Sequence, residues 1–336
     1  MRIGIVGTGF MGRAHAAAWS ATDAQIVGFV SKESDASLEL ADLYGATVYA
    51  DLDALIADVD VVDICTPTHL HRDMVLAAAT AGKDVVCEKP LARSVAQGQE
   101  MIAACAAAGV RLYVAHVVRF FPEYAQAKAQ VDAGVVGKPA VLRCTRGSFQ
   151  PKKAVDNWFV DFEKSGGMML DLMIHDLDYV RWVAGDVQTV FAKKLSSTHP
   201  EADVDHGLVI LTHKGGAISH VEGSWAYPPP IFRTKFEIAG SNGLIQQDSG
   251  KTAAIGLHHY QRANGDVPDV PLPSSPLSED PYTTQIKAFY KSMVEDTAVP
   301  VTGADGLAAL QIALAAIESA ATGLPVHLEP LPEVAS

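Results

Sequence analysis

Short hydrophobic runs alternate with more polar segments along the first third of the chain. The runs are typical of buried strands, and we expect strands at 3–6, 25–30, 47–49, 59–65, 84–87 and 110–118. Between them the pattern predicts helices at 13–20, 36–44, 52–57, 72–81 and 94–108. Strands that alternate with helices of this length indicate an α/β domain with a doubly wound parallel sheet.

The pattern changes after Arg119-Phe120-Phe121-Pro122. One helix is expected at about 123–133, followed by longer strands at 141–147, 187–195, 208–213, 217–225, 232–239, 243–247 and 252–258. Gly215-Gly216 and Ser241-Asn242-Gly243 are hairpin signals between these strands. We therefore expect a large, mostly antiparallel open sheet, with two helices at 282–296 and 304–321 closing the chain.

The length of 336 residues is sufficient for two domains. We place an α/β domain at 1–120. The remainder, 121–336, is expected to form an α+β domain that contains both closing helices.

Composition narrows the range of partners. The net charge is −13 and there is no long basic run, which argues against nucleic acid. The chain begins directly with a strand, without an apolar signal segment, and no hydrophobic run approaches the length of a membrane span. We expect a cytoplasmic protein that engages no membrane.

The chain has four scattered cysteines, Cys65, Cys87, Cys105 and Cys144. They lack the spacing of metal ligands, and their apolar or helical surroundings predict buried free thiols in a reducing compartment. We expect no resident metal.

The first expected strand runs into a G-x-G-x-x-G pattern, Gly7-Thr8-Gly9-Phe10-Met11-Gly12, which opens a helix. Glycine at the first position permits the tight turn, the second lets a pyrophosphate approach, and the third lets the helix pack close to the strand. The helix N-terminus adds free N–H groups and a partial positive charge. This placement predicts a Rossmann domain that binds a dinucleotide.

The end of the second strand bears on the choice of dinucleotide. NAD-binding domains usually carry an acidic residue there, which accepts hydrogen bonds from the ribose, but this chain has Ser31-Lys32. A hydroxyl and a cation suit a 2′-phosphate, which favours NADP. The alternative is that Lys32 points to solvent and Glu33 binds the ribose of NAD.

A lone lysine ends another expected strand, in the segment Cys87-Glu88-Lys89-Pro90. Pro90 stops the strand and biases Lys89 to an extended backbone. The carboxyl ends of parallel strands line the crevice in which open α/β sheets bind ligands. Lys89 is therefore either a functional residue of that crevice or a surface lysine at the end of an ordinary strand.

The strand expected at 59–65 is followed by Thr66-Pro67-Thr68-His69-Leu70-His71. A metal bound by His69 and His71 would need further ligands, and the sequence nearby supplies none. We expect these histidines to contact the cofactor or the substrate entrance.

A second chemically notable stretch spans residues 165–178 and begins with Ser165-Gly166-Gly167. The glycine pair is expected to open a helix that runs to about residue 184. Asp171, His175 and Asp178 are spaced i, i+4 and i+7 and would share one face, while the core would be faced by Met169, Met173 and Val180. The polar stripe is either a carboxylate–imidazole group with a chemical role or a solvated helix face.

Three segments together resemble the glucose–fructose oxidoreductase, inositol dehydrogenase and rhizopine-catabolism (Gfo/Idh/MocA) family of NAD(P)-dependent oxidoreductases. They are 7–12, the Glu-Lys-Pro at 88–90, and 166–178 with its Asp-x-x-x-His. The resemblance covers essentially the whole chain, and Arg119 and Phe120 also match. It implies hydride transfer between a nicotinamide and a carbinol or ketone carbon of a cyclitol or sugar. It further implies a homodimer or homotetramer, for which the exposed face of the sheet is a candidate interface.

The resemblance also implies a catalytic group of Lys89, Asp171 and His175. In oxidation, His175 would take the hydroxyl proton, because an unperturbed imidazole titrates near pH ~6.5. Lys89 would donate a hydrogen bond to the reacting oxygen, and Asp171 would orient the substrate or the imidazole. In the alternative, Lys89 is itself the base, because desolvation and the nearby cationic nicotinamide ring would lower its pKa.

The remaining site residues are expected from position. Those expected to contact the cofactor are Gly7, Gly9, Phe10, Met11, Gly12, Ser31, Lys32, Thr66, Pro67, His69, His71, Glu88, Lys89 and Arg119. A polyol site needs several hydrogen-bonding groups around an apolar wall, and candidates for substrate contact are Asn157, Trp158 and Tyr282.

Three other functions fit the same motifs. One is a glycoside-cleaving enzyme that oxidises the sugar transiently and needs no net redox change. Another is a non-catalytic NAD(P)-binding regulator, which would have no reason to keep Lys89, Asp171 and His175 together. The third is reduction of an imine or enone.

Overall fold

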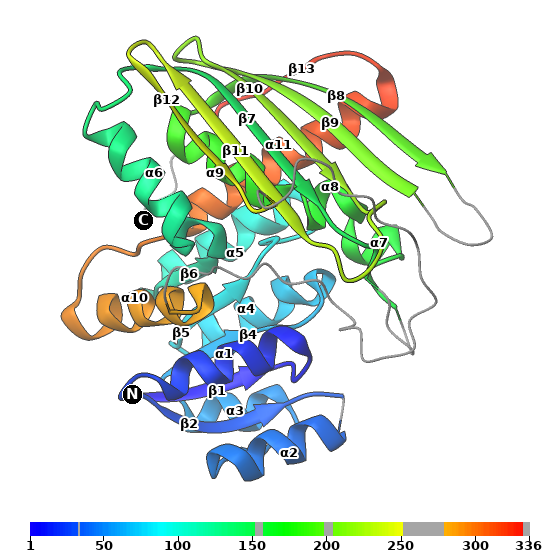
Figure 1. Cartoon of the computed structure of the whole chain (residues 1–336). Helices are drawn as coiled ribbons and strands as arrows, with labels where there is room; N and C mark the ends of the chain where they lie inside the picture. The colour runs from blue at the N-terminus through cyan, green and yellow to red at the C-terminus, as the bar shows by residue number, and fades with distance from the viewer. Residues whose placement is uncertain (33, 152–156, 198–203, 251–278, 332–336) are drawn as a thin grey trace. The chain divides into compact units, whose positions relative to one another are not determined.

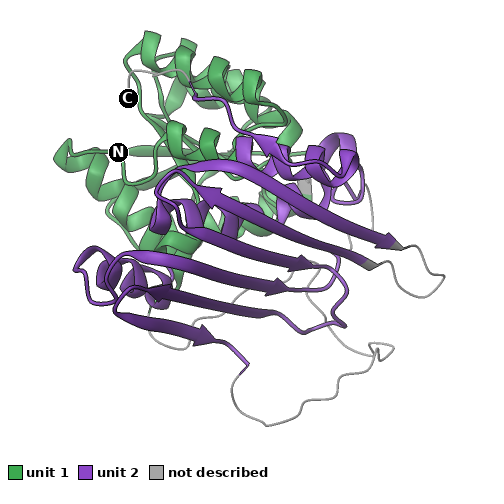
Figure 2. Cartoon of the chain, turned by 90° about the horizontal axis from the view of Figure 1, so that it is seen from above, with its two compact units in different colours: residues 1–120, 277–310, 332–336 green, residues 121–276, 311–331 purple. Residues whose placement is uncertain are grey.

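The computed structural model describes residues 1–32, 34–151, 157–197, 204–250 and 279–331. The chain divides into two compact units (Figure 2). Unit 1 holds Met1–Phe120 and the described part of Leu277–Leu310, and unit 2 holds the described parts of Phe121–Pro276 and Gln311–Leu331.

Unit 1 is built on a parallel sheet of six strands. They are β1 (Arg2–Val6), β2 (Gln25–Val30), β3 (Thr47–Val48), β4 (Val61–Ile64), β5 (Asp84–Glu88) and β6 (Leu112–Ala115). Their order is β3-β2-β1-β4-β5-β6, and every neighbouring pair is parallel. The order reverses between β1 and β4, and doubly wound sheets bind ligands outside the carboxyl ends at such a point. The Rossmann prediction is confirmed.

Helices connect these strands much as the hydrophobic pattern predicts. They are α1 (Phe10–Ser20), α2 (Ser34–Tyr44), α3 (Leu52–Asp58), the 3₁₀ turn η1 (Thr68–Leu70), α4 (His71–Thr80) and α5 (Val95–Ala108). The strand expected at 110–118 is wrong at its end, because β6 stops at Ala115 and the chain turns into η2 (Val117–Phe120). The amide of His116 donates back to the carbonyl of Val114 (2.9 Å), which takes the chain out of the sheet.

The first closing helix, α10 (Pro281–Glu295), belongs to unit 1, so its expected place in the second domain is wrong. Phe289 of α10 packs against Tyr113 and Phe120, with ring centroids 5.2 and 5.8 Å apart. The hydroxyls of Tyr113 and Ser292 lie 3.2 Å apart. This buried cluster joins segments far apart in sequence, which a local hydrophobic pattern does not reveal.

Unit 2 contains a seven-stranded sheet. Its strands are β7 (Pro139–Gly147), β8 (Val187–Ser197), β9 (Val204–His213), β10 (Ile218–Ser224), β11 (Arg233–Gly240), β12 (Gly243–Asp248) and β13 (Val326–His327). The order is β12-β11-β7-β10-β9-β8-β13, and among these described strands only β7 and β10 pair in parallel. The mostly antiparallel sheet is confirmed and β13 is an unexpected addition, while the strand expected at 252–258 lies outside the described residues.

Among the described residues, the helices that lie wholly within unit 2 are α6 (Pro122–Asp132), α7 (Phe162–Ser165), α8 (Gly167–Asp171) and α9 (Ile174–Ala184). Helices α8 and α9 pack on one face of the sheet (Figure 1). The core there includes Tyr124, Tyr179 and Phe236, whose ring centroids lie 4.8–5.7 Å apart.

The single helix expected from the glycine pair to residue 184 is interrupted between Asp171 and Ile174. Met173, in the interruption, lies against Gly223 of β10, where an added Cβ would be 2.3 Å from its Cγ. Gly207, the β9 partner of Gly223, also faces Met173. The paired glycines leave space in the sheet surface, and Met173 fills it.

The second closing helix, α11 (Gly303–Thr322), runs from unit 1 into unit 2. It is long and apolar enough to cross a membrane, so the expectation that no run approaches that length is wrong. However, 56% of its most apolar window is buried inside the protein, which is typical of a core helix.

Candidate functional site

The glycine-rich turn has the geometry that requires glycine. Gly7 has a φ of +97°, and an added Cβ would lie 2.7 Å from the carbonyl oxygen of Cys65 at the end of β4. A Cβ at Gly12 would lie 1.9 Å from the carbonyl oxygen of Gly7. These two glycines therefore allow β1, α1 and the end of β4 to meet closely.

The N-terminus of α1 suits an anionic group. Gly9 is its N-cap and provides no capping side chain, and the first turn of the helix contains no acidic residue. The free N–H groups and the positive end of the helix dipole are thus left for a ligand such as a pyrophosphate. Phe10 and Met11, the first residues of α1, are half-buried beside this position. The residues present fit a dinucleotide.

The two residues after β2 differ in exposure. Ser31 is half-buried and Lys32 is exposed. Glu33, the alternative ribose ligand, lies outside the described residues. The predicted choice of NADP over NAD stays a prediction.

The buried side chain of His71 stabilises the segment that follows β4. Its ring is fully buried, with Nδ1 3.0 Å from the carbonyl oxygen of Pro90 and Nε2 2.8 Å from that of Thr66. Burial lowers the pKa of His71, and the two carbonyl contacts oppose this by favouring an N–H on each nitrogen. His71 thus ties the turn after β4 to the turn after β5. The neighbouring Pro67 is half-buried and His69 is exposed, and cofactor contact by these residues stays a prediction.

Lys89 immediately follows β5 and is half-buried. Its backbone N–H donates to Oε2 of Glu88 (3.0 Å), a buried carboxylate. The lysine therefore stands at the carboxyl end of β5, as the sequence predicts. In the sheet, β4 separates β5 from the β1–β4 switch point. Arg119 is also buried in unit 1, where its Nη2 lies 3.3 Å from Asp305.

The structure also brings together His15 and Asp63, which are fully buried, and Cys65, which is half-buried, a cluster that the sequence does not predict. Their donor atoms lie within 4.8 Å of one another, as metal ligands would. However, Asp63 already accepts hydrogen bonds from Trp19 (2.7 Å) and His15 (2.9 Å). Burial raises the pKa of the Cys65 thiol strongly, which disfavours the thiolate a metal needs. The cluster is a hydrogen-bonded network.

In unit 2, Asp171 is the last residue of α8 and His175 the second of α9. Asp171 is 8% exposed, Asp178 is fully buried, and His175 is half-buried. The interpretation of this stripe as a solvated helix face is therefore wrong. The methionines Met169 and Met173 are buried, as expected.

Sequence reasoning missed the partner that fixes α9. Arg146 of β7 donates to Asp176 through Nε (2.6 Å) and Nη2 (3.0 Å), and both side chains are buried. One signal was available, since Leu142, Cys144 and Arg146 alternate along β7 and share its buried face.

The candidate substrate residues do not fall in one unit. Asn157 and Trp158 are half-buried in unit 2, where Asn157 donates to the carbonyl of Pro151 (3.0 Å) and Trp158 stacks on Phe159. Tyr282 opens α10 in unit 1 and is 8% exposed.

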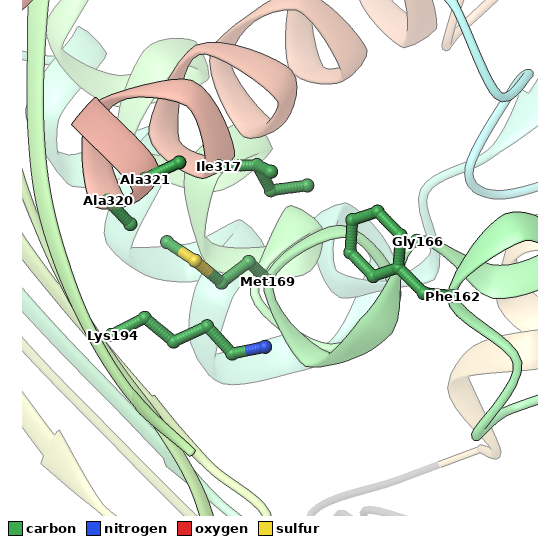
Figure 3. A pocket seen from close by; sticks show the side chains of 7 residues that line it. All are labelled: Phe162, Gly166, Met169, Lys194, Ile317, Ala320 and Ala321. Atoms are coloured by element: carbon green, nitrogen blue, oxygen red, sulfur yellow. The ribbon is translucent and has the colours of Figure 1, made fainter.

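A cavity of about 190 Å³ lies in unit 2 beside α8 (Figure 3). Its lining is Phe162, Gly166, Met169, Lys194, Ile317, Ala320 and Ala321. The ammonium of Lys194 is also 3.2 Å from Asp205. Among the described residues, the lining offers one ammonium and otherwise apolar side chains, whereas a polyol needs several hydrogen-bonding groups.

Two family models match the chain. One, described as an oxidoreductase family with an NAD-binding Rossmann fold, matches residues 1–116, and the GFO/IDH/MocA C-terminal domain matches 124–246. The chain therefore belongs to the GFO/IDH/MocA family and is an NAD-binding oxidoreductase of that family.

Individual relatives agree with this assignment. The chain is 32% identical to a myo-inositol 2-dehydrogenase of Thermotoga maritima, over 98% of this chain and 99% of that protein. Among solved structures, it is similar to a putative myo-inositol dehydrogenase from Sinorhizobium meliloti (TM-score 0.82, 26% identity, covering 98% of this chain and 100% of the other). It is equally similar to a levoglucosan dehydrogenase in complex with NADH and L-sorbose (TM-score 0.82, 25% identity, 98% and 99%).

Proposed function

We propose that this protein is an NAD(P)-dependent dehydrogenase of a cyclitol or sugar. The observation that carries the proposal is Lys89 at the carboxyl end of β5, in the same sheet as a glycine-rich turn built for a dinucleotide. The relatives support the substrate class, since two of them are named for myo-inositol and one was solved with L-sorbose.

The nicotinamide cofactor, when bound, supplies or accepts the hydride, and the protein supplies binding and electrostatics. Gly7, Gly9 and the N-terminus of α1 would hold the pyrophosphate. Lys89 donates a hydrogen bond to the reacting oxygen and stabilises its developing negative charge.

Asp171 and His175 complete the proposed catalytic group from unit 2. His175 accepts the hydroxyl proton during oxidation, and Asp171 orients the substrate or the imidazole. The two residues lie four apart in sequence, at the end of α8 and in the first turn of α9, which supports a joint role.

The test is a screen of inositols, aldoses and anhydrosugars with NAD and NADP, followed through the absorbance of the reduced nicotinamide. We expect net reduction of the cofactor with at least one substrate, and loss of turnover in Lys89→Ala with cofactor binding within a few-fold of wild type. Lys83→Ala is the matched control, because Lys83 stands just before β5 at its other end. Equal loss of cofactor binding and turnover in Lys89→Ala would mean that Lys89 holds the cofactor only.

We further propose that the protein is a homodimer or homotetramer. The described part of the unit 2 sheet exposes several large hydrophobic residues, Leu195, Leu208, Ile210, Ile218 and Leu244. A sheet face with this composition favours association with a second copy.

A further inference from the structure

In unit 1, a row of buried polar side chains leads by successive contacts to the backbone of Lys89. Asp63 of β4 accepts a hydrogen bond from Trp19 Nε1 (2.7 Å) and lies 2.9 Å from Nδ1 of His15. The other ring nitrogen of His15, Nε2, lies 3.2 Å from Oε1 of Glu88. The second oxygen of Glu88 accepts the backbone N–H of Lys89 at 3.0 Å.

His15 therefore has a carboxylate on each side. Its side chain and that of Asp63 are fully buried, and Glu88 is 6% exposed. The Nε2–H is not aligned on Glu88 well enough for a hydrogen bond, so this contact is an ion pair. Burial alone would lower the pKa of His15, but the charge of Asp63 and the hydrogen bond to it raise this pKa well above 6.5. An imidazolium between two carboxylates satisfies both contacts, whereas a neutral ring carries only one N–H.

The orientation of Glu88 links this row to the candidate site. One oxygen of its carboxylate is directed to His15 and the other to the amide of Lys89, so fixing the first constrains the second. Asp63 also accepts a contact from Cys65 (3.5 Å), but the contact that joins His15 to Lys89 runs through the Glu88 carboxylate.

We propose that His15 is a positioning residue. Held by Asp63, it fixes the orientation of the Glu88 carboxylate, and this carboxylate in turn fixes the backbone of Lys89. The effect on the Lys89 backbone is independent of the proposed function, whereas the effect on turnover rests on it. A histidine that merely fills the core between α1 and the sheet would show no such coupling.

Two substitutions of similar size separate the contacts of His15. Asparagine places its amide near the position of Nδ1 and can bond Asp63, but it does not reach Glu88. Glutamine extends toward the position of Nε2 and can direct an amide N–H at Glu88. A role in packing alone would make His15→Asn and His15→Gln equivalent at Lys89.

The experiment is hydrogen exchange, read by mass spectrometry, on the peptide that contains Lys89. We expect the Lys89 amide of His15→Asn to exchange about five- to tenfold faster than in wild type, as for loss of roughly one hydrogen bond. His15→Gln should lie closer to wild type. His213→Asn is the matched control, because His213 is a buried histidine of unit 2 that contacts Gly185 O (2.6 Å) and Ser219 Oγ (2.7 Å). It should lower thermal stability and leave exchange at Lys89 unchanged.

Unchanged protection at Lys89 in His15→Asn, or the same exchange rate in both His15 variants, would overturn the proposal. If His15→Asn does not fold, Asp63→Asn provides the same test, because it removes the charge that holds His15 from the other side.

Turnover then separates this proposal from the proposed function. We expect kcat of His15→Asn to fall by about tenfold or more through misplacement of Lys89, with little change in cofactor affinity. Faster exchange with an unchanged kcat would support the positioning role of His15. It would count against Lys89 as a catalytic residue.

Discussion

The guanidinium of Arg146 binds the carboxylate of Asp176 through two hydrogen bonds, of 2.6 and 3.0 Å, with both side chains almost completely buried. Asp176 lies in the first turn of α9, directly after His175, and Arg146 lies on β7. The pair therefore fixes the start of α9, with His175, on the sheet.

Removing one member of this pair should strongly destabilise the protein. Asp176→Leu leaves the Arg146 guanidinium buried without its carboxylate, which typically costs about 3–5 kcal/mol. Arg146→Met with Asp176→Leu should recover most of this loss, because no buried charge remains. The free energy of unfolding in urea measures both. Glu100→Ala, which breaks an exposed ion pair with Arg72, is the control and should cost far less. A single variant that behaves like this control would contradict the prediction.

A second prediction concerns Gly223, against which Met173 packs. Gly223→Ala would place a Cβ 2.3 Å from Met173 Cγ, an atom near the backbone that cannot easily move aside. We expect a loss of about 1–3 kcal/mol from overpacking, and reduced turnover because Met173 lies between Asp171 and His175. Denaturation and steady-state kinetics test the two effects.

The control is Gly215→Ala in the turn between β9 and β10. Its nearest neighbour to an added Cβ, the carbonyl oxygen of Ala184, is 3.9 Å away. This variant should remain close to wild type in stability. Equal effects of the two substitutions would mean that contact with Met173 is not what requires glycine at 223.

The third prediction follows from the charge of His15. A histidine whose pKa is raised on folding contributes stability that is fully present below its unfolded pKa, about 6.5, and is lost as pH rises through the folded value. Between about pH 6.5 and 8, wild type should therefore lose stability relative to His15→Asn, by at most ~1.4 kcal/mol per pH unit. Urea midpoints at several pH values give this difference.

Two other buried histidines act in a separate pH window. Burial lowers the pKa of His71 and of His213. Their contribution is present above about pH 6.5 and is lost as pH falls through the lowered values. A difference between wild type and His15→Asn that is constant above pH 6.5 would contradict the imidazolium assigned to His15.

The fourth prediction concerns the exposed sheet face of unit 2. Leu208 and Ile210 of β9 are 42% and 37% exposed. If this face joins two copies, Leu208→Lys with Ile210→Lys should shift the protein toward monomer in sedimentation at a fixed concentration. Leu43→Lys is the control, because Leu43 lies on α2 of unit 1 and is 68% exposed. An unchanged oligomeric state in the sheet variant would place the interface elsewhere.

The hydrophobic pattern predicted most elements because most depend on local spacing. The β–α alternation of unit 1 and the glycine turn are set by residues close in sequence, and the structure confirms both. The pattern failed where distant segments decide. Phe289 draws α10 to Tyr113 in unit 1, and Gly223 accommodates the Met173 interruption. Both contacts join residues that no local window contains.

The candidate site divides in the same way. Lys89 and the glycines could be identified because strand ends and turns have sequence signatures. His15 and Asp63 could not, since a single histidine in an alanine-rich helix is typical of many structures. Its importance depends on β4 and β5 placing a carboxylate on each side of it.

The last prediction concerns Lys32 and the choice of cofactor. The exposed ammonium just after β2, beside the half-buried Ser31, favours a 2′-phosphate, so we expect NADPH to bind more tightly than NADH. Loss of a charge-assisted hydrogen bond in Lys32→Ala should weaken NADPH binding by about tenfold and leave NADH binding nearly unchanged. Titrations that follow quenching of the fluorescence of the four tryptophans measure both affinities.

Lys214→Ala, an exposed lysine of unit 2, controls for the change in net charge. A similar loss of NADPH affinity in this control would indicate long-range attraction instead of a phosphate contact, and that loss should disappear at high salt. Tighter binding of NADH, with no effect of Lys32→Ala, would transfer the ribose contact to an acidic side chain such as Glu33. The glycine turn and the N-terminus of α1 would serve either cofactor, because both contact only the pyrophosphate that the two share.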